Sequence, residues 1–191
     1  MRIIAGLAKG RALSSVAGAT RPTTDRAREG LFSSLLSEFG DFTGLNFLDL
    51  FAGSGAIGLE ALSRGADIVH AVEKDASAMR TINKNEELVA KSGVVGKFHA
   101  FAMSSQKFLE TASPTKYDIV YVDPPYDFSD GELDKCLTLL RDGGFLHGDA
   151  VVAVERSNRS KTFTWPDGFE QLRERKYGQA SIFYGKLEEN G

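Results

Sequence analysis

The chain has 191 residues, of which 42% are hydrophobic and 26% are charged, and its formal net charge is -3. This length and composition suit a single globular domain, and the slightly acidic balance is unlike that of a general nucleic-acid binder. The single cysteine, Cys136, excludes an internal disulfide and a four-cysteine metal site, and the three histidines lack metal-ligand spacing, so no metal is expected. The lack of a membrane-span or signal-peptide pattern predicts a cytoplasmic protein.

The start of the chain is predicted to form a β-hairpin arm, residues 1–20, ahead of a domain that occupies residues 21–191. Short apolar segments alternate loosely around Gly6 and Gly10, a pattern typical of a hairpin. Positive charge gathers in this part, which would suit RNA held at one edge of an active site, although a solvated arm without a partner fits the charge equally well. The candidate RNA-binding residues are Arg2, Lys9, Arg11, Arg21, Arg26 and Arg28.

A helix is predicted to begin after the arm, at Thr23 or Thr24. Either threonine can act as its N-cap, because a hydroxyl there accepts a hydrogen bond from the first helical turn. The predicted apolar face of this helix consists of Ala27, Leu31, Leu35 and Phe39. Arg26 and Arg28 fall in the opening turn, where each is either an RNA contact or an ordinary solvated side chain.

From residue 45 the hydrophobic pattern alternates between strands and helices. Strands are predicted at 46–51, 68–73, 97–101, 117–122 and 150–155, and helices at 56–64, 75–91, 104–112 and 130–141. Two further strands, 171–177 and 180–186, are joined by Gly178 and Gln179 alone, so they form a hairpin and the last strand runs antiparallel. The predicted fold class is α/β: a Rossmann-like, seven-stranded, mostly parallel sheet with an N-terminal hairpin and helix.

The segment 46–60 combines a short buried strand, a glycine turn and the start of a helix. Gly53, Gly55 and Gly58 occur there at G-x-G-x-x-G spacing, and glycine allows a ligand to approach backbone N–H groups closely. This arrangement is typical of a nucleotide-cofactor site. The same spacing is also the dinucleotide fingerprint, and a tight turn without a ligand fits it too.

Two acidic residues indicate which cofactor would bind. Asp49 lies inside the apolar strand, where a carboxylate is costly without a partner, and Glu73 ends the second strand, where an acid can accept both ribose hydroxyls. Asp49 beside the glycine turn suits a cofactor with an amino-acid tail, which favours S-adenosyl-L-methionine. The candidate cofactor residues here are Asp49, Phe51, Ala52, Gly53, Ser54, Gly55, Glu73 and Lys74.

The candidate catalytic residues follow the strand at 117–122, and they are Asp123, Pro124, Pro125 and Tyr126. Two prolines fix the backbone in one shape, at the edge of the sheet where open α/β folds bind ligands. Asp123 and the Pro124 carbonyl would accept hydrogen bonds from an exocyclic amine of a base, and Tyr126 would stack on the extruded base. Methyl transfer would then be a direct displacement, favoured by orientation and electrostatics, with Asp123 also near the cofactor. A Pro-Pro turn with a surface tyrosine is the plain structural alternative.

Four segments together resemble the bacterial 16S rRNA guanine-N2 methyltransferase family: residues 2–6, 21–26, 51–66 and 123–126 (RIIAG, RPTTDR, FAGSGAIGLEALSRGA and DPPY). The resemblance implies a class I methyltransferase fold and methylation of one guanine of 16S rRNA, either naked or in the assembling small ribosomal subunit. We expect a monomer. The family often has a polar residue near the adenine of the cofactor, whereas this chain offers only the backbone of Ala102 and Met103 and their packing.

Three other functions remain open at this point. The DPPY motif also fits an adenine-N6 methyltransferase of nucleic acids. A nicotinamide oxidoreductase would account for the glycines and Glu73 but would leave the DPPY segment without a role. A non-catalytic RNA-binding assembly factor would account for the basic arm but not for the acids at strand ends.

Overall fold

The computed structural model describes residues 1–18, 24–111, 115–157 and 163–189. Its helices are α1 (Asp25–Phe39), α2 (Ala56–Ser63), α3 (Ala76–Ala90), α4 (Ser105–Glu110) and α5 (Asp130–Asp142). Its strands are β1 (Asn46–Asp49), β2 (Ile68–Glu73), β3 (Lys97–Ala102), β4 (Tyr117–Val122), β5 (Leu146–Ser157), β6 (Phe169–Tyr177) and β7 (Ala180–Leu187). No helix in these ranges is both long and apolar enough to cross a bilayer.

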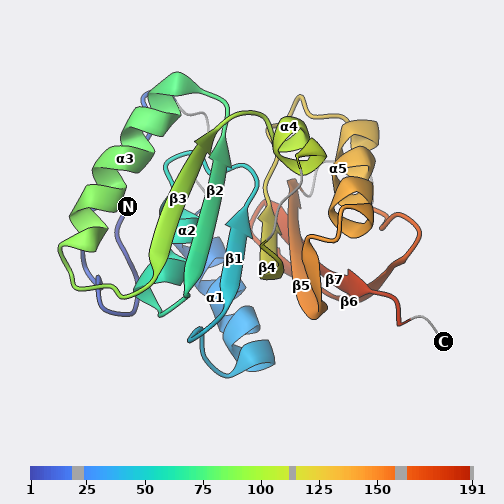
Figure 1. Ribbon diagram of the computed structural model, residues 1–191, viewed down its shortest axis with the longest axis horizontal. Coiled ribbons are helices and arrows are strands. Elements are labelled where there is room, and N and C mark those ends of the chain that lie inside the picture. The colour runs from blue at the N-terminus through green and yellow to red at the C-terminus, as the bar shows by residue number, and fades with distance from the viewer. Residues whose placement is uncertain (19–23, 112–114, 158–162, 190–191) are drawn as a thin grey trace.

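All seven strands form one sheet in the order β3-β2-β1-β4-β5-β7-β6 (Figure 1). Strands β1 to β5 pair in parallel, and β7 pairs antiparallel with both β5 and β6. The predicted α/β class, the mostly parallel sheet and the antiparallel last strand are therefore confirmed.

Each face of the sheet is covered by its own set of helices, because successive strand residues point to opposite sides. On one face Phe47 and Ile119 pack with buried residues of α1, α2 and α3. On the other, Leu48 and Val120 pack with α4 and α5, where Cys136 lies in the core as an ordinary buried residue. The two cores fix the sheet from both sides, so the strand ends that carry the site are rigidly held.

Several predicted strand boundaries are wrong by one to four residues, among them the end of the first strand and the start of the fifth. The first strand ends at Asp49 rather than at residue 51, because the backbone turns out of the ladder toward the glycines, although Ala52 N still donates to Val72 O over 3.0 Å. Strand β5 begins at Leu146 rather than at residue 150, since Leu146 pairs with Tyr117 ahead of an irregularity in the register. Helix α1 begins where predicted, with Thr24 as its N-cap.

The predicted hairpin arm is present as one antiparallel bridge, between Arg2 and Ala12, with a turn docked on the domain. The buried carboxylate of Glu60 on α2 accepts hydrogen bonds from the backbone N–H of Ile4 (2.8 Å) and of Ala5 (3.0 Å). Farther along, the side chain of Asn85 on α3 bonds both backbone groups of Ser14. The first 14 residues are thus an integral layer of the fold and not a free arm.

Candidate functional site

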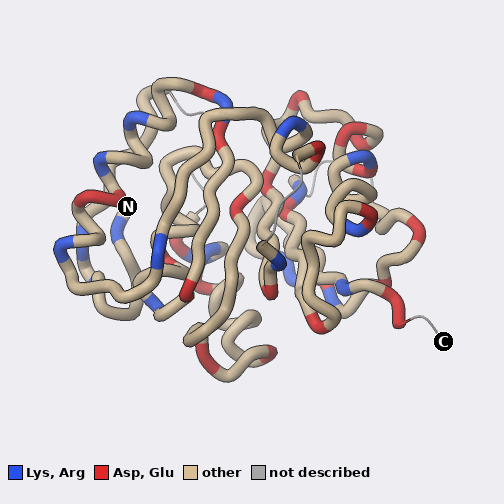
Figure 2. The backbone as a smooth tube through the Cα atoms, viewed as in Figure 1, with Lys and Arg blue, Asp and Glu red and all other residues tan. Residues whose placement is uncertain are grey.

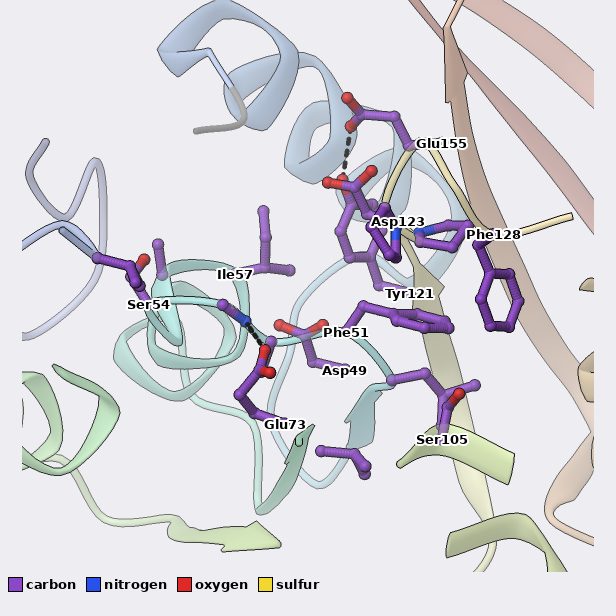
Figure 3. A pocket seen from close by; sticks show the side chains of 18 of the residues that line it. Asp49, Phe51, Ser54, Ile57, Glu73, Ser105, Tyr121, Asp123, Phe128 and Glu155 are labelled. Carbon is purple, nitrogen blue, oxygen red and sulfur yellow. Dashed lines mark hydrogen bonds between the residues drawn. The ribbon is translucent and has the colours of Figure 1, made fainter. Parts of the chain in front are cut away.

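A cavity of about 710 Å³ opens at the carboxyl ends of β1, β2, β4 and β5 (Figure 3). Strand β1 leads into the glycine turn on one side, and β4 leads into the DPPY segment on the other. In Figure 3 Glu73 lies toward the glycine-turn side and Asp123 toward the other, with Asp49 between them in this view. The topology therefore brings together the two motifs that are more than 60 residues apart in the sequence.

Glu73 holds the glycine turn in place. One of its carboxylate oxygens accepts a hydrogen bond from Gly53 N and the other from Asp75 N, each over 2.8 Å. A carboxylate has about four acceptor positions, so two remain for ligand hydroxyls. The residue thus fixes the turn and still faces the cavity.

The glycines of the motif serve two different purposes. Gly53 has a φ of +54°, and a Cβ added there would meet no atom within 4 Å, so its backbone is bare toward the cavity. A Cβ on Gly58 would lie 3.0 Å from Val69 and 3.2 Å from Phe98, so this glycine lets α2 pack closely on the sheet. The first glycine leaves room for a ligand and the third serves packing.

Asp49 is a buried acid at the base of the cavity. Its exposed fraction is 1%, and its Oδ1 has no hydrogen-bond partner within the described part of the chain. Burial raises its pKa from 3.8 to about 7, and the charge of Glu73 adds to the increase. Such a carboxylate is poised to receive a positively charged ligand group, whose charge would favour the ionised form.

The DPPY segment forms the opposite wall of the cavity. Asp123 is half-buried, Pro124 and Pro125 follow it along the wall, and Tyr126 is 68% exposed at the mouth. The exposed ring of Tyr126 is available to stack on an incoming base. The carboxylate of Asp123 and the exposed ring of Tyr126 therefore stand at one opening, as an extruded base requires.

Several cavity residues were not predicted from the sequence. Phe128 packs edge-on against Phe51, with ring centroids 5.1 Å apart, and forms an apolar wall beside Asp123. The buried hydroxyl of Tyr121 donates a hydrogen bond of 2.6 Å to Glu155, whose exposed fraction is 7%. Glu155 follows a buried apolar run on β5. An acid at this place in a parallel strand indicates a ligand site, so the sequence pattern could have predicted Glu155 as a site residue.

The predicted cofactor residues divide into two groups. The cavity is lined by Asp49, Phe51, Ala52, Gly53, Ser54, Glu73, Lys74, Met103 and Asp123. Gly55 and Ala102 are not part of the lining. Gly55 instead begins α2 in the left-handed conformation, and a Cβ there would lie 3.3 Å from Ile82.

Arg28, predicted as a surface contact with RNA, is fully buried. Its guanidinium donates to the Arg2 backbone carbonyl over 2.6 Å and to Asp25 over 2.9 Å. Helical spacing explains the correction, since Arg28 precedes Phe32 by four residues and Leu35 by seven and so shares their buried face. The side chain also lines the cavity, with its Nε and Nη1 lacking partners within the described ranges.

The other candidate RNA-binding residues lie at different edges of the sheet. Arg26 is exposed at the start of α1, on the cavity side, while Arg21 lies outside the described residues. Lys9 and Arg11 lie near the far ends of α2 and α3, since Leu7 N bonds Ser63 O and Arg11 bonds Ser92. The exposed Arg2 lies beside Arg28, whose guanidinium binds its carbonyl.

A further basic row follows the surface of α3 (Figure 2). Arg80, Lys84 and Lys91 are exposed, and their spacing places them on one helical face. Arg80 lies in the half of α3 nearer the cavity. The spacing of these three residues in the sequence is that of one helical face.

No group of three or more His, Cys, Asp or Glu side chains within the described ranges is placed to hold a metal ion. The cavity is lined by carboxylates, aromatic rings, hydroxyls and the cationic side chains of Arg28, Lys74 and Arg156. These groups suit recognition of a cationic cofactor and of hydrogen-bond donors on a base.

The chain matches the model of a protein family described as Conserved hypothetical protein 95 over residues 1–186. It is 37% identical to the ribosomal RNA small subunit methyltransferase D of Escherichia coli (strain K12), covering 100% of this chain and 92% of that protein. It is 31% identical to the putative rRNA methyltransferase YlbH of Bacillus subtilis (strain 168), covering 95% of this chain and 96% of the relative. Among solved structures, the putative methyltransferase yhhF of Escherichia coli superposes with a TM-score of 0.82 and 34% identity, covering 98% of each chain.

Proposed function

The chain belongs to the Conserved hypothetical protein 95 family, and from that premise we propose that it is an S-adenosyl-L-methionine-dependent methyltransferase of small-subunit ribosomal RNA. The reaction methylates the exocyclic N2 of one guanine in 16S rRNA. The observation that carries the proposal is the meeting of the glycine turn, Asp49 and the DPPY segment in one cavity. We further propose that the protein acts as a monomer in the cytoplasm, on the rRNA or the assembling small subunit.

The residues of the cavity fit this cofactor. The bare backbone at Gly53 leaves space for the amino-acid arm, and the unpartnered Oδ1 of Asp49 offers a buried negative charge to its positive end. Glu73 keeps acceptor positions for the ribose hydroxyls, and Met103 lines the cavity on the side of the adenine. When bound, the cofactor supplies a methyl group on a sulfonium, ready for displacement.

The DPPY segment orients the nucleophile. Asp123 and the Pro124 carbonyl accept the two N–H groups of the guanine amine, which aims its lone pair away from the ring and at the methyl carbon. Asp123 or water would take the proton that the amine loses once it carries the methyl group. Tyr126 and the Phe128 wall hold the extruded base in place.

The strand order supports a methyltransferase over a nicotinamide oxidoreductase. Dinucleotide-binding sheets run 3-2-1-4-5-6 with parallel strands throughout. Here β7 runs antiparallel between β5 and β6. A role in RNA binding without catalysis would leave the buried Asp49 and the DPPY carboxylate without a purpose.

The test of the proposed function is methylation of rRNA followed by mapping. Small-subunit rRNA and subunits from a strain lacking the gene are incubated with the protein and S-adenosyl-L-methionine, and the product is digested and mapped by mass spectrometry. We expect one N2-methylguanosine. Methylation of an adenine would favour the adenine-N6 alternative, and no methylation of either substrate form would overturn the proposal.

Cofactor binding is expected to depend on pH through Asp49. The pKa of Asp49 is raised to about 7. In the free protein its carboxyl therefore stabilises the folded state fully below the unfolded pKa of 3.8, and this stabilisation is lost as the pH rises through 7. A cationic cofactor favours the ionised form, so its affinity should fall by up to about tenfold per unit as the pH drops below 7. The measurement is the cofactor dissociation constant at about pH 6, 7 and 8.

The matched control for this pH prediction is Asp49→Asn. It keeps the shape of the side chain but removes the titrating carboxyl, so the variant should bind more weakly above pH 7 and lose most of the pH dependence. A wild-type affinity that does not change between about pH 6 and 8 would contradict the placement of the cofactor beside Asp49.

Binding to rRNA should rely on cations at the cavity edge more than on those at the far edge. Arg26→Ala should lower the slope of log affinity against log salt by about one unit, because one phosphate contact is lost. Lys9→Ala removes the same charge at the opposite edge of the sheet and should change the slope less. Salt titrations of rRNA binding measure both, and equal slopes for the two variants would show that the RNA lies across both edges.

A further inference from the structure

The pair of Tyr121 and Glu155 lies directly beside the catalytic acid. Tyr121 pairs with Ala153 and Val122 with Val154 in the parallel ladder of β4 and β5. Asp123 directly follows the end of β4 and Glu155 is the next residue of β5, so the two side chains leave neighbouring segments at the same end of the sheet. Figure 3 shows both near the Tyr121 hydroxyl, at the same end of the cavity.

Glu155 lines the cavity, and a hydrogen bond from Tyr121 holds its side chain. The Tyr121 hydroxyl donates a hydrogen bond of 2.6 Å to the Oε2 of Glu155. Glu155 is part of the cavity lining although its exposed fraction is only 7%. The two neighbouring acidic side chains therefore present carboxyl oxygens that can accept hydrogen bonds.

The purine bases differ at the position next to the reacting amine. On the Watson–Crick edge of guanine the N2 amine lies beside N1–H, so two neighbouring groups donate. On adenine the N6 amine lies beside an unprotonated N1, which accepts. A pair of carboxylates complements the first pattern and repels the second, and enzymes that extrude a base read this edge.

We propose that Glu155 is a specificity-determining residue that accepts the N1–H of the target guanine while Asp123 accepts the neighbouring N2–H. Tyr121 is its positioning residue, because its hydroxyl fixes the Glu155 carboxylate. This inference rests on the proposed function and adds to it the group that rejects adenine. It gives a ligand-binding role to Glu155, which belongs to neither the glycine turn nor the DPPY segment.

The test compares two bases that carry the same reactive amine. Guanine and 2-aminopurine both have the exocyclic 2-amine, but N1 of 2-aminopurine is an acceptor. Each base is placed at the mapped site by ligating a synthetic oligonucleotide into 16S rRNA, presented in the form that proves to be methylated. The measured quantity is the ratio of kcat/KM for guanine to that for 2-aminopurine.

The wild-type protein should prefer guanine by on the order of 10–100-fold, since a hydrogen bond to a charged acceptor is lost with 2-aminopurine. Glu155→Gln should bring the ratio to within a few-fold of one, because the amide can donate to N1. Tyr121→Phe should lower the ratio less, by roughly a few-fold, through loss of the fixing hydroxyl. Glu87→Gln, an exposed change of the same chemistry on α3, should leave the ratio unaltered.

The outcomes separate this inference from the proposed function. If the wild type methylates guanine and the ratio is the same in Glu155→Gln, the inference is overturned while the function stands. If Glu155→Gln does not fold, an unchanged ratio in Tyr121→Phe overturns it instead. If the wild type methylates neither RNA, the proposed function fails and the specificity role fails with it.

Discussion

Asp123→Ala should reduce methyl transfer by on the order of 10³-fold while leaving S-adenosyl-L-methionine affinity within about threefold of the wild type. The reason is geometric. Asp123 lies on the DPPY wall, where we propose that it accepts a hydrogen bond from the amine, whereas the glycine turn and Glu73, the proposed cofactor-binding groups, lie across the cavity. The measurement is single-turnover methylation of the mapped guanine, with cofactor binding measured by calorimetry.

Two further variants sharpen this experiment. Asp123→Asn keeps one acceptor oxygen at the same place, so its rate should fall between those of the alanine variant and the wild type. Asp134→Ala removes the same charge from the exposed surface of α5 and should keep the wild-type rate. A loss of cofactor binding as severe as the loss of rate would show that Asp123 serves the cofactor and not the amine.

The parts of this site that follow from the sequence are those set by local pattern. Alternating apolar runs place the strands, and Asp49, Glu73 and Asp123 each stand in or after such a run, where a parallel sheet brings ligands. The same rule applied to β5 would have found Glu155. Its bond to Tyr121 was out of reach, because it depends on the register between two strands 34 residues apart in the chain.

The misplaced residues show where composition misleads. A count of the charges in this segment places Arg28 with exposed residues. Its position in the helical repeat instead puts it on the same buried face as Leu31 and Phe32. The docking of the N-terminal hairpin on the domain could not be predicted for a related reason. Its apolar residues, Ile3 and Leu13, are core residues, and the backbone groups around them are satisfied by Glu60 and Asn85, which lie far away in the sequence.

Docking of the N-terminal layer should make Gly6 one of the least replaceable residues. A Cβ at this position would lie 1.8 Å from the Ser63 carbonyl oxygen at the end of α2, which no side-chain movement can relieve. Gly6→Ala should therefore lift the turn away from α2. The lifted turn would withdraw the two backbone N–H donors from the buried Glu60 carboxylate and expose Ile3.

Gly10→Ala is the matched control for Gly6→Ala. Gly10 has a φ of +85° against +83° for Gly6, so alanine adds nearly the same backbone strain, but its Cβ would meet nothing within 4 Å. Gly10→Ala should cost about 1–2 kcal/mol from strain alone. Gly6→Ala should cost about 2–4 kcal/mol more, because hydrogen bonds to a buried charge are lost. Urea unfolding of both variants measures the difference, and equal losses would mean that the N-terminal layer is not docked on α2 in solution.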